Sequence, residues 1–246
     1  MQGSDTVLKQ LLAAFERESH LILQNHLIQM SFSGGTLTVA GEVPDIASRK
    51  RIIHLAHSLS GAAELVDHLR VRVESPVGDG AMRDSVCERL LQAVDFRNCV
   101  ICARVKGQVE ILRGTMDAAG NEDGSGAIEV TVQDGVVTLT GQVISLSHKR
   151  LAGVFAWWAG SCREVVNLLD VFPAEEDNDD EITDALHLVL EIDPCVHADQ
   201  ITIKSLNRTV TLEGWVSSEA ERRRAEQDAW YLDAIDQVVN RIDVRA

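Results

Sequence analysis

Cys99 and Cys102 form the most recognisable pair of potentially reactive side chains in this sequence. A zinc site of this kind needs a second pair of Cys or His ligands at a suitable spacing, and none stands nearby. A redox pair needs a setting, such as a helix N-terminus, that lowers the thiol pKa. On an extended strand the two thiols would face opposite sides. A metal or redox role for this pair is therefore the least favoured of the functions considered below.

Two further groups of potential metal ligands are incomplete. His54 and His57 lie three residues apart on one predicted helix, but no third ligand is evident. The segment 121–124 is similar to part of an EF-hand loop, yet Ala119 and Val130 stand where the first and twelfth positions need oxygen ligands. No nucleophile elbow, phosphate loop or dinucleotide fingerprint is present. The sequence therefore predicts no catalytic residue, no bound metal and no cofactor.

Three basic clusters stand at nearly the same place in three predicted helices. They are Arg49-Lys50-Arg51, His148-Lys149-Arg150 and Arg222-Arg223-Arg224. Repeated cations of this kind could bind lipid phosphates or another anion. They could also form a solvated helix face, because Glu219 and Arg223 have the spacing of an ion pair within a helix. This structural alternative is favoured. The candidate lipid- or anion-binding residues are Arg49, Lys50, Arg51, Lys149, Arg150, Arg222, Arg223 and Arg224.

Two pairs of adjacent aromatic residues occupy equivalent positions near the ends of two of these helices. They are Trp157-Trp158 and Trp230-Tyr231, and His57-Ser58 stand at this place in the remaining helix. Adjacent helix residues point about 100° apart, so one ring of a pair can enter the core while the other stays at the surface. We expect these aromatics to pack between domains, with a membrane interface as the alternative.

All of these candidates are positioned by a segment that recurs three times. Gly41, Gly141 and Gly214 anchor an alignment that runs without a gap from thirteen residues before the glycine to thirty after it. The matching positions are Ile28, Ile128 and Ile201; Val43, Val143 and Val216; Ala56, Ala156 and Ala229; Val66, Val166 and Val239; Val71, Val171 and Val244. Agreement at so many fixed offsets indicates internal repeats.

Each repeat is predicted to contain a helix, two strands, a second helix and a third strand. The two strands before the glycine form a hairpin with a turn at Gly34-Gly35, at Asp134-Gly135 or, as a weaker signal, at Asn207-Arg208. The expected N-caps of the second helices are Asp45, Ser145 and Ser218. Their apolar stripes are Ile52-Ala56-Leu59, Ala152-Ala156-Ala159 and Ala225-Ala229-Leu232. Val86, Leu90 and Val94 mark the first helix of the second repeat.

The predicted fold class is α+β, with three tandem small αββαβ modules, each a mixed three-stranded sheet covered by two helices. The expected domains are residues 1–74, 81–172 and 180–246. The second carries an insertion at about 97–126, which could hold a hairpin from Ile101–Val105 and Gln108–Leu112. A module of about 60 residues is marginal alone, so packing between modules is expected.

Composition limits the choice of partner. The 246 residues include 23 Lys and Arg against 38 Asp and Glu, which gives a formal net charge of -15. A chain this acidic is not expected to bind nucleic acid, because phosphate affinity depends mostly on Lys and Arg. Residues 1–74 carry a net charge of -1, residues 75–172 of -3 and residues 173–246 of -11. Contact with an anionic surface is therefore better placed in the first two modules.

The N-terminal residues and the cysteines bear on the compartment. Residues 1–15 show no basic region, apolar segment or cleavage site of a secretory leader, which predicts a cytoplasmic location; a periplasmic one is the alternative if a leader was removed. An odd number of cysteines favours reduced thiols. They are Cys87, Cys99, Cys102, Cys162 and Cys195.

The repeat resembles the BON domain, a bacterial module named for osmotic-shock and nodulation proteins. The likeness is clearest in the third copy, in Ile201-Thr202-Ile203, Val210 to Val216, Glu221-Arg222, Ala225-Glu226 and Val238-Val239-Asn240. The second copy matches through Val130 to Gly141 and Val165-Val166-Asn167. The first is the most divergent, with Asp67 in place of the asparagine.

The resemblance implies a non-enzymatic binding protein that contacts phospholipid or membrane surfaces in envelope maintenance or stress response. The alternative is a soluble protein–protein interaction scaffold with a composite surface across the repeats. A metal or redox role of Cys99 and Cys102 is a distant third. The expected partner is thus an anionic phospholipid surface or another protein, and the oligomeric state is left open.

Overall fold

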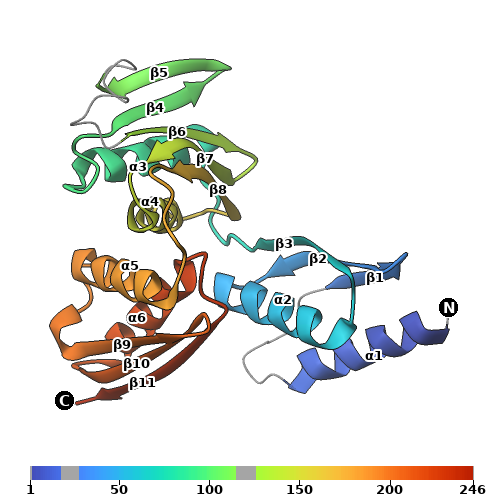
Figure 1. Ribbon diagram of the computed structural model, residues 1–246. Coiled ribbons are helices and arrows are strands. Elements are labelled where there is room, and N and C mark those ends of the chain that lie inside the picture. The colour runs from blue at the N-terminus through green and yellow to red at the C-terminus, as the bar shows by residue number, and fades with distance from the viewer. Residues whose placement is uncertain (1, 18–27, 115–125, 246) are drawn as a thin grey trace. The chain divides into compact units, whose positions relative to one another are not determined.

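The computed structural model describes residues 2–17, 28–114 and 126–245, which fold into two compact units (Figure 1). The first unit is Met1–Val73 and the second is Glu74–Ala246. One module makes up the first unit, and two modules make up the second. The EF-hand-like segment 121–124 and part of the insertion at about 97–126 lie outside the described residues.

Each module follows the predicted order of elements. The first contains α1 (Gln2–Arg17), β1 (Gln29–Ser33), β2 (Thr36–Val43), α2 (Ile46–Ser60) and β3 (Glu64–Val71). The second contains α3 (Asp79–Gln92), β4 (Val100–Val105), β5 (Gln108–Arg113), β6 (Gly126–Gln133), β7 (Val136–Val143), α4 (Leu146–Trp158) and β8 (Glu164–Val171). The third contains α5 (Asp179–Ile192), the short 3-10 helix η3 (Ala198–Gln200), β9 (Ile201–Leu206), β10 (Thr209–Val216), α6 (Glu219–Tyr231) and β11 (Gln237–Val244).

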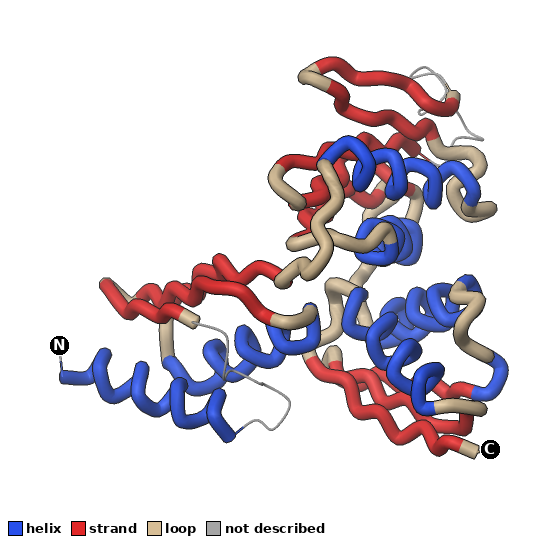
Figure 2. The backbone as a smooth tube through the Cα atoms, turned by 180° about the vertical axis from the view of Figure 1, so that it is seen from behind, coloured by secondary structure: helices blue, strands red, loops and turns tan. Residues whose placement is uncertain are grey.

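The three sheets share one topology. In each sheet the strand before the second helix (β2, β7 or β10) pairs antiparallel with the preceding strand and parallel with the last one. A parallel partner requires a crossover connection, and the second helix supplies it. Both helices of each module lie against one face of its sheet (Figure 2). These features confirm the α+β class and the three-module architecture.

The second module differs from the other two in its sheet. The hairpin predicted in its insertion is present as β4 and β5, and β4 pairs parallel with β6. The strand order is β5-β4-β6-β7-β8, whereas the described residues of the first and third modules form three strands each. The three-stranded prediction therefore describes the outer modules, and the insertion adds two strands to the middle one. β5 is an edge strand, and its residues Gln108 to Leu112 are exposed.

The repeated glycine is required by strand pairing. Gly141 and Gly214 have φ of 121° and 128°, a region that L side chains rarely adopt. A Cβ at Gly141 would lie 2.1 Å from the carbonyl oxygen of Ala127, and one at Gly214 would lie 2.0 Å from that of Gln200. The positive φ and the nearby carbonyl oxygen both disfavour a Cβ at this position. This explains why the same glycine recurs in every copy.

The hairpin turns are fastened by an aspartate from the first helix of the module. In the second module Asp79 accepts hydrogen bonds from the Asp134 and Gly135 amides, both at 2.9 Å. In the third, Asp179 accepts from the amides of Asn207 (2.7 Å) and Arg208 (3.0 Å). Asn207 and Arg208 both have positive φ, 49° and 60°. The Asp179 carboxylate therefore supports a turn whose own sequence favours it only weakly.

The helix N-caps and the buried positions agree with the repeat, except that two residues expected to be buried are exposed. Asp45, Ser145 and Ser218 cap α2, α4 and α6 as predicted, each accepting from the amide three residues on. The stripe position Leu59 is 46% exposed, because the buried side of the last turn of α2 passes through Ala56 and Ser60 instead. Val94 is 71% exposed, because α3 ends before it, at Gln92. No helix within the described residues has the length and apolar character to cross a bilayer.

Candidate functional site between the second and third modules

The second and third modules meet through aromatic side chains at the ends of α4 and α6. The Trp157 and Tyr231 rings stack with centroids 5.7 Å apart and planes 11° from parallel. Trp158 donates through its indole N–H to Asp228 Oδ1 at 2.9 Å. Trp230 is buried and donates to Glu226 of its own helix at 3.4 Å. Three of the four predicted interface aromatics thus join one module to the other.

A cluster of charged groups lies beside these rings. Asp228 is fully buried, and the side chain of Asp193, which follows α5, is 2% exposed. Arg224 forms an ion pair with Asp193 and lies 3.5 Å from Asp228. The Arg224 guanidinium also stands 5.2 Å from the centre of the Trp158 ring. One cation thus serves two buried carboxyl groups, and an indole from the neighbouring module completes the cluster.

The two carboxyl groups have opposite pKa shifts. Burial, assisted by the hydrogen bond with Asp193, raises the pKa of Asp228 to about 8 against the opposing effect of Arg224. Burial also acts to raise the pKa of Asp193, but hydrogen bonds from Asp228, from the Cys195 amide and from Arg224 lower it overall. At neutral pH the pair therefore holds one proton, on Asp228, and Asp193 carries the charge that pairs with Arg224.

Sequence reasoning missed this cluster although the repeat contained a signal for it. The residue fourteen positions after the glycine is Leu55 in the first copy, Phe155 in the second and Asp228 in the third. An acidic residue at a position that is apolar in the other copies marks either a surface or a buried polar site. The distinction depends on Asp193 and Trp158, which lie far away in sequence.

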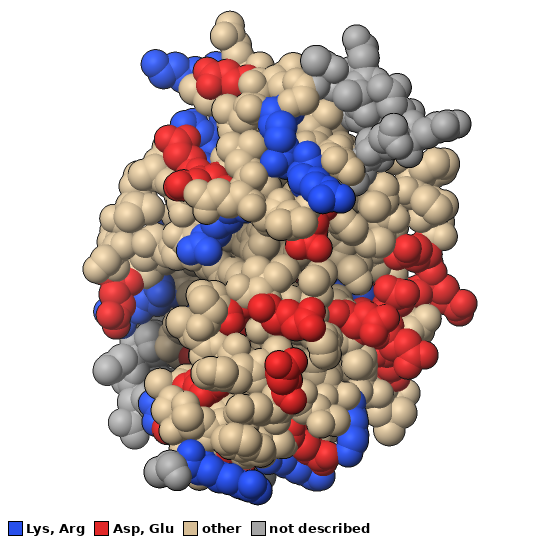
Figure 3. Space-filling model, turned by 90° about the vertical axis from the view of Figure 1, so that its left-hand side faces the viewer, with Lys and Arg blue, Asp and Glu red and all other residues tan. Residues whose placement is uncertain are grey.

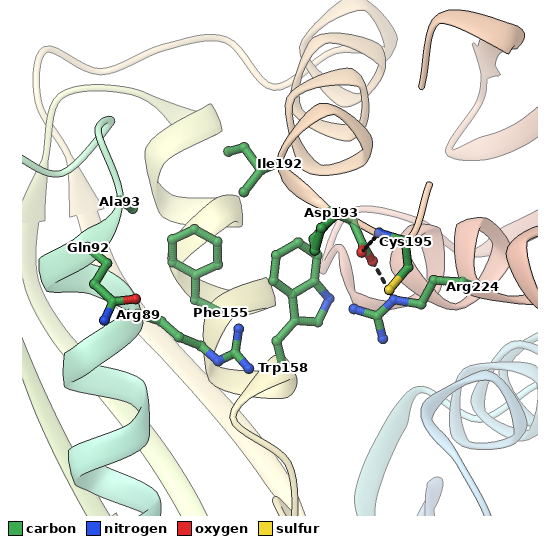
Figure 4. Close-up of a pocket in the computed structure, with 10 residues that line it drawn as sticks. Arg89, Gln92, Ala93, Phe155, Trp158, Ile192, Asp193, Cys195 and Arg224 are labelled. Atoms are coloured by element: carbon green, nitrogen blue, oxygen red, sulfur yellow. Dashed lines mark hydrogen bonds and ion pairs between the residues drawn. The ribbon is translucent and has the colours of Figure 1, made fainter. Parts of the chain in front are cut away.

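A cleft of about 530 Å³ opens next to the cluster (Figure 4). Its lining comes from the ends of α3, α4 and α5 and from α6: Arg89, Gln92, Ala93, Phe155, Trp158, Ile192, Asp193, Pro194, Cys195 and Arg224. Figure 4 shows the Arg89 side chain extending from α3 toward Trp158. Most of the lining surface is apolar; the charged groups are Arg89 from the second module and Asp193 and Arg224 from the third. This combination is typical of small-molecule sites.

The basic clusters are largely neutralised by the chain's own carboxylates. Arg49 pairs with Asp67, Arg150 with Asp177, Arg222 and Arg223 with Glu219, and Arg224 with Asp193 and Asp228. Arg150 is 4% exposed, and its partner comes from the acidic linker before α5. Lys50, Arg51 and Lys149 are half-buried. On the face drawn in Figure 3, acidic side chains form a band across the middle, and Lys and Arg lie toward both ends. Anion binding by these residues stays a prediction.

One polar position of the family pattern fastens the last strand to the second helix. The residue twenty-six positions after the glycine is Asp67, Asn167 or Asn240. Asn167 donates to the carbonyl of Lys149 at 2.7 Å, and Asn240 donates to that of Arg222 at 3.1 Å. A carboxylate cannot donate, and Asp67 instead accepts from the Arg49 guanidinium at 2.9 Å. The divergent residue of the first module thus keeps its role through a changed partner.

The cysteine pair has the surroundings of structural thiols. Cys99 and Cys102 are both buried. Burial raises the pKa of Cys99 to about 11, against an opposing effect of Arg113, and burial also raises the pKa of Cys102. Such thiols are protonated and unreactive at neutral pH. His54 and His57 are exposed on α2. Within the described part of the chain, no three His, Cys, Asp or Glu side chains are grouped to hold a metal ion.

Three copies of one α+β module, joined in tandem, define a class of repeat proteins built from a single small domain. The family model of the BON domain matches residues 4–73, 108–173 and 178–246. The chain therefore belongs to the BON domain family and carries three copies. BON domains are non-catalytic binding modules known in membrane- and envelope-associated proteins.

Two of the solved structures that are similar to the chain are of one protein, and no curated protein matches the chain. One is the C-terminal domain of CdsD, the structural protein of the type III secretion system of Chlamydia trachomatis, with 15% identity, a TM-score of 0.25 and coverage of 96% of this chain and 98% of that one. The other is a second structure of CdsD, with 15% identity, a TM-score of 0.23 and coverage of 96% and 92%.

Proposed function

We propose that this chain is a non-catalytic protein-interaction scaffold in which the second and third modules act as one platform. The observation that carries the proposal is the inserted β4–β5 hairpin, which has no counterpart among the described residues of the other two modules. It ends in an edge strand with three exposed apolar side chains, Val109 (45%), Ile111 (48%) and Leu112 (43%). No strand within the described residues pairs with the outer edge of β5.

An exposed apolar edge strand is a ready template for a further strand. Its backbone donors and acceptors would supply affinity, and the side chains of Val109 and Ile111 would supply specificity. The occupant that fits is an extended, apolar segment of a partner protein. The exposed Lys106 of the hairpin turn favours an acidic residue at one end of that segment.

A displayed library of random peptides tests this role on the full chain. We expect enrichment of extended sequences with alternating apolar residues, whose binding falls at least tenfold in the Ile111→Lys variant. Leu206→Lys is the matched control, because Leu206 is also exposed on an edge strand, at 70%, but on β9. Equal binding of the peptides to Ile111→Lys and to the unchanged protein would show that β5 is not the binding site.

Phospholipid contact is the second candidate, and a different observation favours it. Leu168 on β8 and Phe172 just after it are 58% and 67% exposed, an apolar and aromatic pair suited to a headgroup interface. The ion pairs of Arg150 and Arg224 weigh against a phosphate-binding role for the basic clusters. Membrane contact would therefore rest more on apolar insertion than on charge.

Sedimentation with vesicles separates this candidate from the scaffold. Binding through Phe172 predicts cosedimentation with zwitterionic as well as anionic vesicles and its loss in Phe172→Ser. Binding through the clusters predicts cosedimentation with anionic vesicles only, weakened by salt and by the Lys149→Gln/Arg223→Gln double variant. Absence of cosedimentation under all conditions leaves the scaffold as the account of the chain.

A further inference from the structure

We propose that the cleft between the second and third modules binds a small carboxylate with a flat, apolar body, such as an aromatic acid. The inference is independent of the peptide-binding role of β5, since none of the cleft residues belongs to that strand. It rests on the size of the cleft, the chemistry of its walls, and one arginine, Arg89, for which the described part of the chain supplies no carboxylate partner.

The cleft has the dimensions and lining of a small-molecule site. Its volume of about 530 Å³ falls in the range, roughly 300–1,000 Å³, that holds small ligands. Phe155 and Trp158 form one aromatic wall, with ring centroids 5.6 Å apart and planes 37° from parallel. Ile192 and Pro194 supply apolar surface from the third module. Walls of this kind favour a planar body over a branched or strongly hydrated one.

Arg89 supplies the recognition of the anion. It stands in the last turn of α3, is exposed, and extends toward Trp158 (Figure 4). No carboxylate within the described residues pairs with it. The other cation of the cleft, Arg224, is already bound to Asp193. A ligand carboxylate could therefore pair with Arg89 without breaking an existing ion pair.

The charge balance of the cleft favours a single negative group. Arg224 and Asp193 cancel, and Asp228 is held protonated by its burial and its contact with Asp193. Arg89 then leaves the cleft with one positive charge in a chain of net charge -15. The acidity of the chain gives no long-range attraction to anions, so recognition has to come from contacts inside the cleft.

The aromatic wall is held in place before any ligand arrives. The indole N–H of Trp158 is bound to Asp228, and its ring carries the Arg224 guanidinium on one side. Phe155 packs edge-on against the buried Phe96, with ring centroids 5.9 Å apart. A wall fixed in this way loses little conformational freedom when it is covered, which favours binding.

Binding in the cleft can be measured through the alkylation of Cys195, which lines it. It is the one exposed cysteine, since the other four are buried. Iodoacetamide should therefore alkylate Cys195 first, and peptide mass analysis identifies the site. A ligand in the cleft covers this thiol and slows its alkylation. The probe is 2-naphthoate, compared with 2-naphthylmethanol, which has the same rings without the charge, and with octanoate, which has the charge without the rings.

We expect 2-naphthoate to protect Cys195 at concentrations at least tenfold below those of either comparison compound. Arg89→Gln should raise the concentration of naphthoate needed for half-protection by about tenfold or more, as loss of a charge-assisted hydrogen bond requires. Arg97→Gln, which removes an exposed arginine outside the cleft, should leave it unchanged. Equal protection of Arg89→Gln and the unchanged protein, or no protection by naphthoate up to about 10 mM, would overturn the proposal.

Discussion

The second helices of the first and third modules, α2 and α6, hold the same place in the same fold but differ in what their last turns contact. At the position of Leu55 in α2 stands Asp228 in α6, and at that of Ser58 stands Tyr231. Ser58 is exposed, whereas Asp228 is fully buried and Tyr231 stacks on a tryptophan of the second module. The first module, whose α2 ends in polar residues, forms a compact unit by itself. The third module, whose α6 ends in aromatic residues, belongs to one compact unit with the second.

This difference shows that the repeat contains two kinds of position: those that build the module and those that join one module to another. Positions that build the module are alike in all copies, such as the glycine of the central strand and the cap of the second helix. The positions at the contact between the second and third modules differ from copy to copy, because only those two copies share this contact. Substitutions at the shared positions and at the individual positions should therefore have different effects on stability.

The largest effect is expected from a shared feature. Gly214→Val places a Cβ 2.0 Å from the carbonyl oxygen of Gln200 and forces a side chain into a positive φ. We expect a loss of more than about 4 kcal/mol in the free energy of unfolding of the third module, measured by denaturant titration.

Gly160→Ala is the matched control, because Gly160 also has positive φ, 76°, but a Cβ there meets nothing within 4 Å. It should cost only about 1 kcal/mol. A similar cost for the two substitutions would show that close strand approach does not select the repeated glycine.

The next effect concerns the contact between modules. Trp158→Ala removes the ring that packs on Phe155 and takes from Asp228 its indole donor. We expect a loss of about 3 kcal/mol and a split of one unfolding transition into two, followed by tryptophan fluorescence and far-UV circular dichroism. Ser58→Ala, at the equivalent position of α2, should change stability by no more than about 0.5 kcal/mol. A single unshifted transition in Trp158→Ala would contradict the proposed role of this contact in joining the second and third modules.

The third prediction is that the free energy of unfolding depends on pH through Asp228 of α6, a residue with no acidic counterpart in α2. The folded pKa of Asp228 is about 8 against an ordinary value of 3.8, so the folded chain binds more protons than the unfolded chain between these values. Stability should therefore fall as pH rises from about 4 to about 8. Asp228→Asn keeps a neutral hydrogen-bonding group and removes the titration. Relative to the unchanged protein, this variant should gain about 2 kcal/mol or more between pH 5 and pH 8.5.

Denaturant titrations at the two pH values measure that gain, and Asp233→Asn serves as control, because Asp233 is an exposed aspartate two residues past α6. The same difference between Asp228→Asn and the unchanged protein at both pH values would mean that Asp228 is ionised throughout and that the shared proton does not exist.

The smallest effect tests the position that fastens the last strand. Asp67→Asn removes the ion pair with Arg49, whose side chains are 16% and 24% exposed, and should cost about 0.5–1 kcal/mol. Adding Arg49→Lys should cost less in this background than alone, because the asparagine can then donate to the helix carbonyl as in the other modules. Strict additivity in this double-mutant cycle would mean that the two residues do not act as a pair.

The sequence was sufficient to predict the fold because local signals and the repeat agree. The hairpin turns, the caps Asp45, Ser145 and Ser218, and the extra hairpin of the insertion all depend on near neighbours in the chain. The exposure of Leu59 and Val94 was missed, since periodicity alone does not say where a helix ends or which residue of its last turn faces the core.

The candidate site was predicted only in part. The aromatic pairs were expected at a domain contact because their positions repeat while their types differ from the first copy. The carboxyl pair of Asp193 and Asp228 was not foreseen, because its meaning depends on burial and on Trp158, seventy residues away from Asp228. The roles of Asp79 and Asp179 were missed for a similar reason. Each binds a turn in another part of its module.

The most direct test of the account is whether the second and third modules move as one body. Nuclear magnetic relaxation of backbone amides gives a rotational correlation time for each module in the full chain. We predict one common value for residues 79–171 and 179–244 in the unchanged protein, and two different values in Trp158→Ala. Different values in the unchanged protein would contradict the account, because neither a joint platform nor a cleft between the modules could then persist.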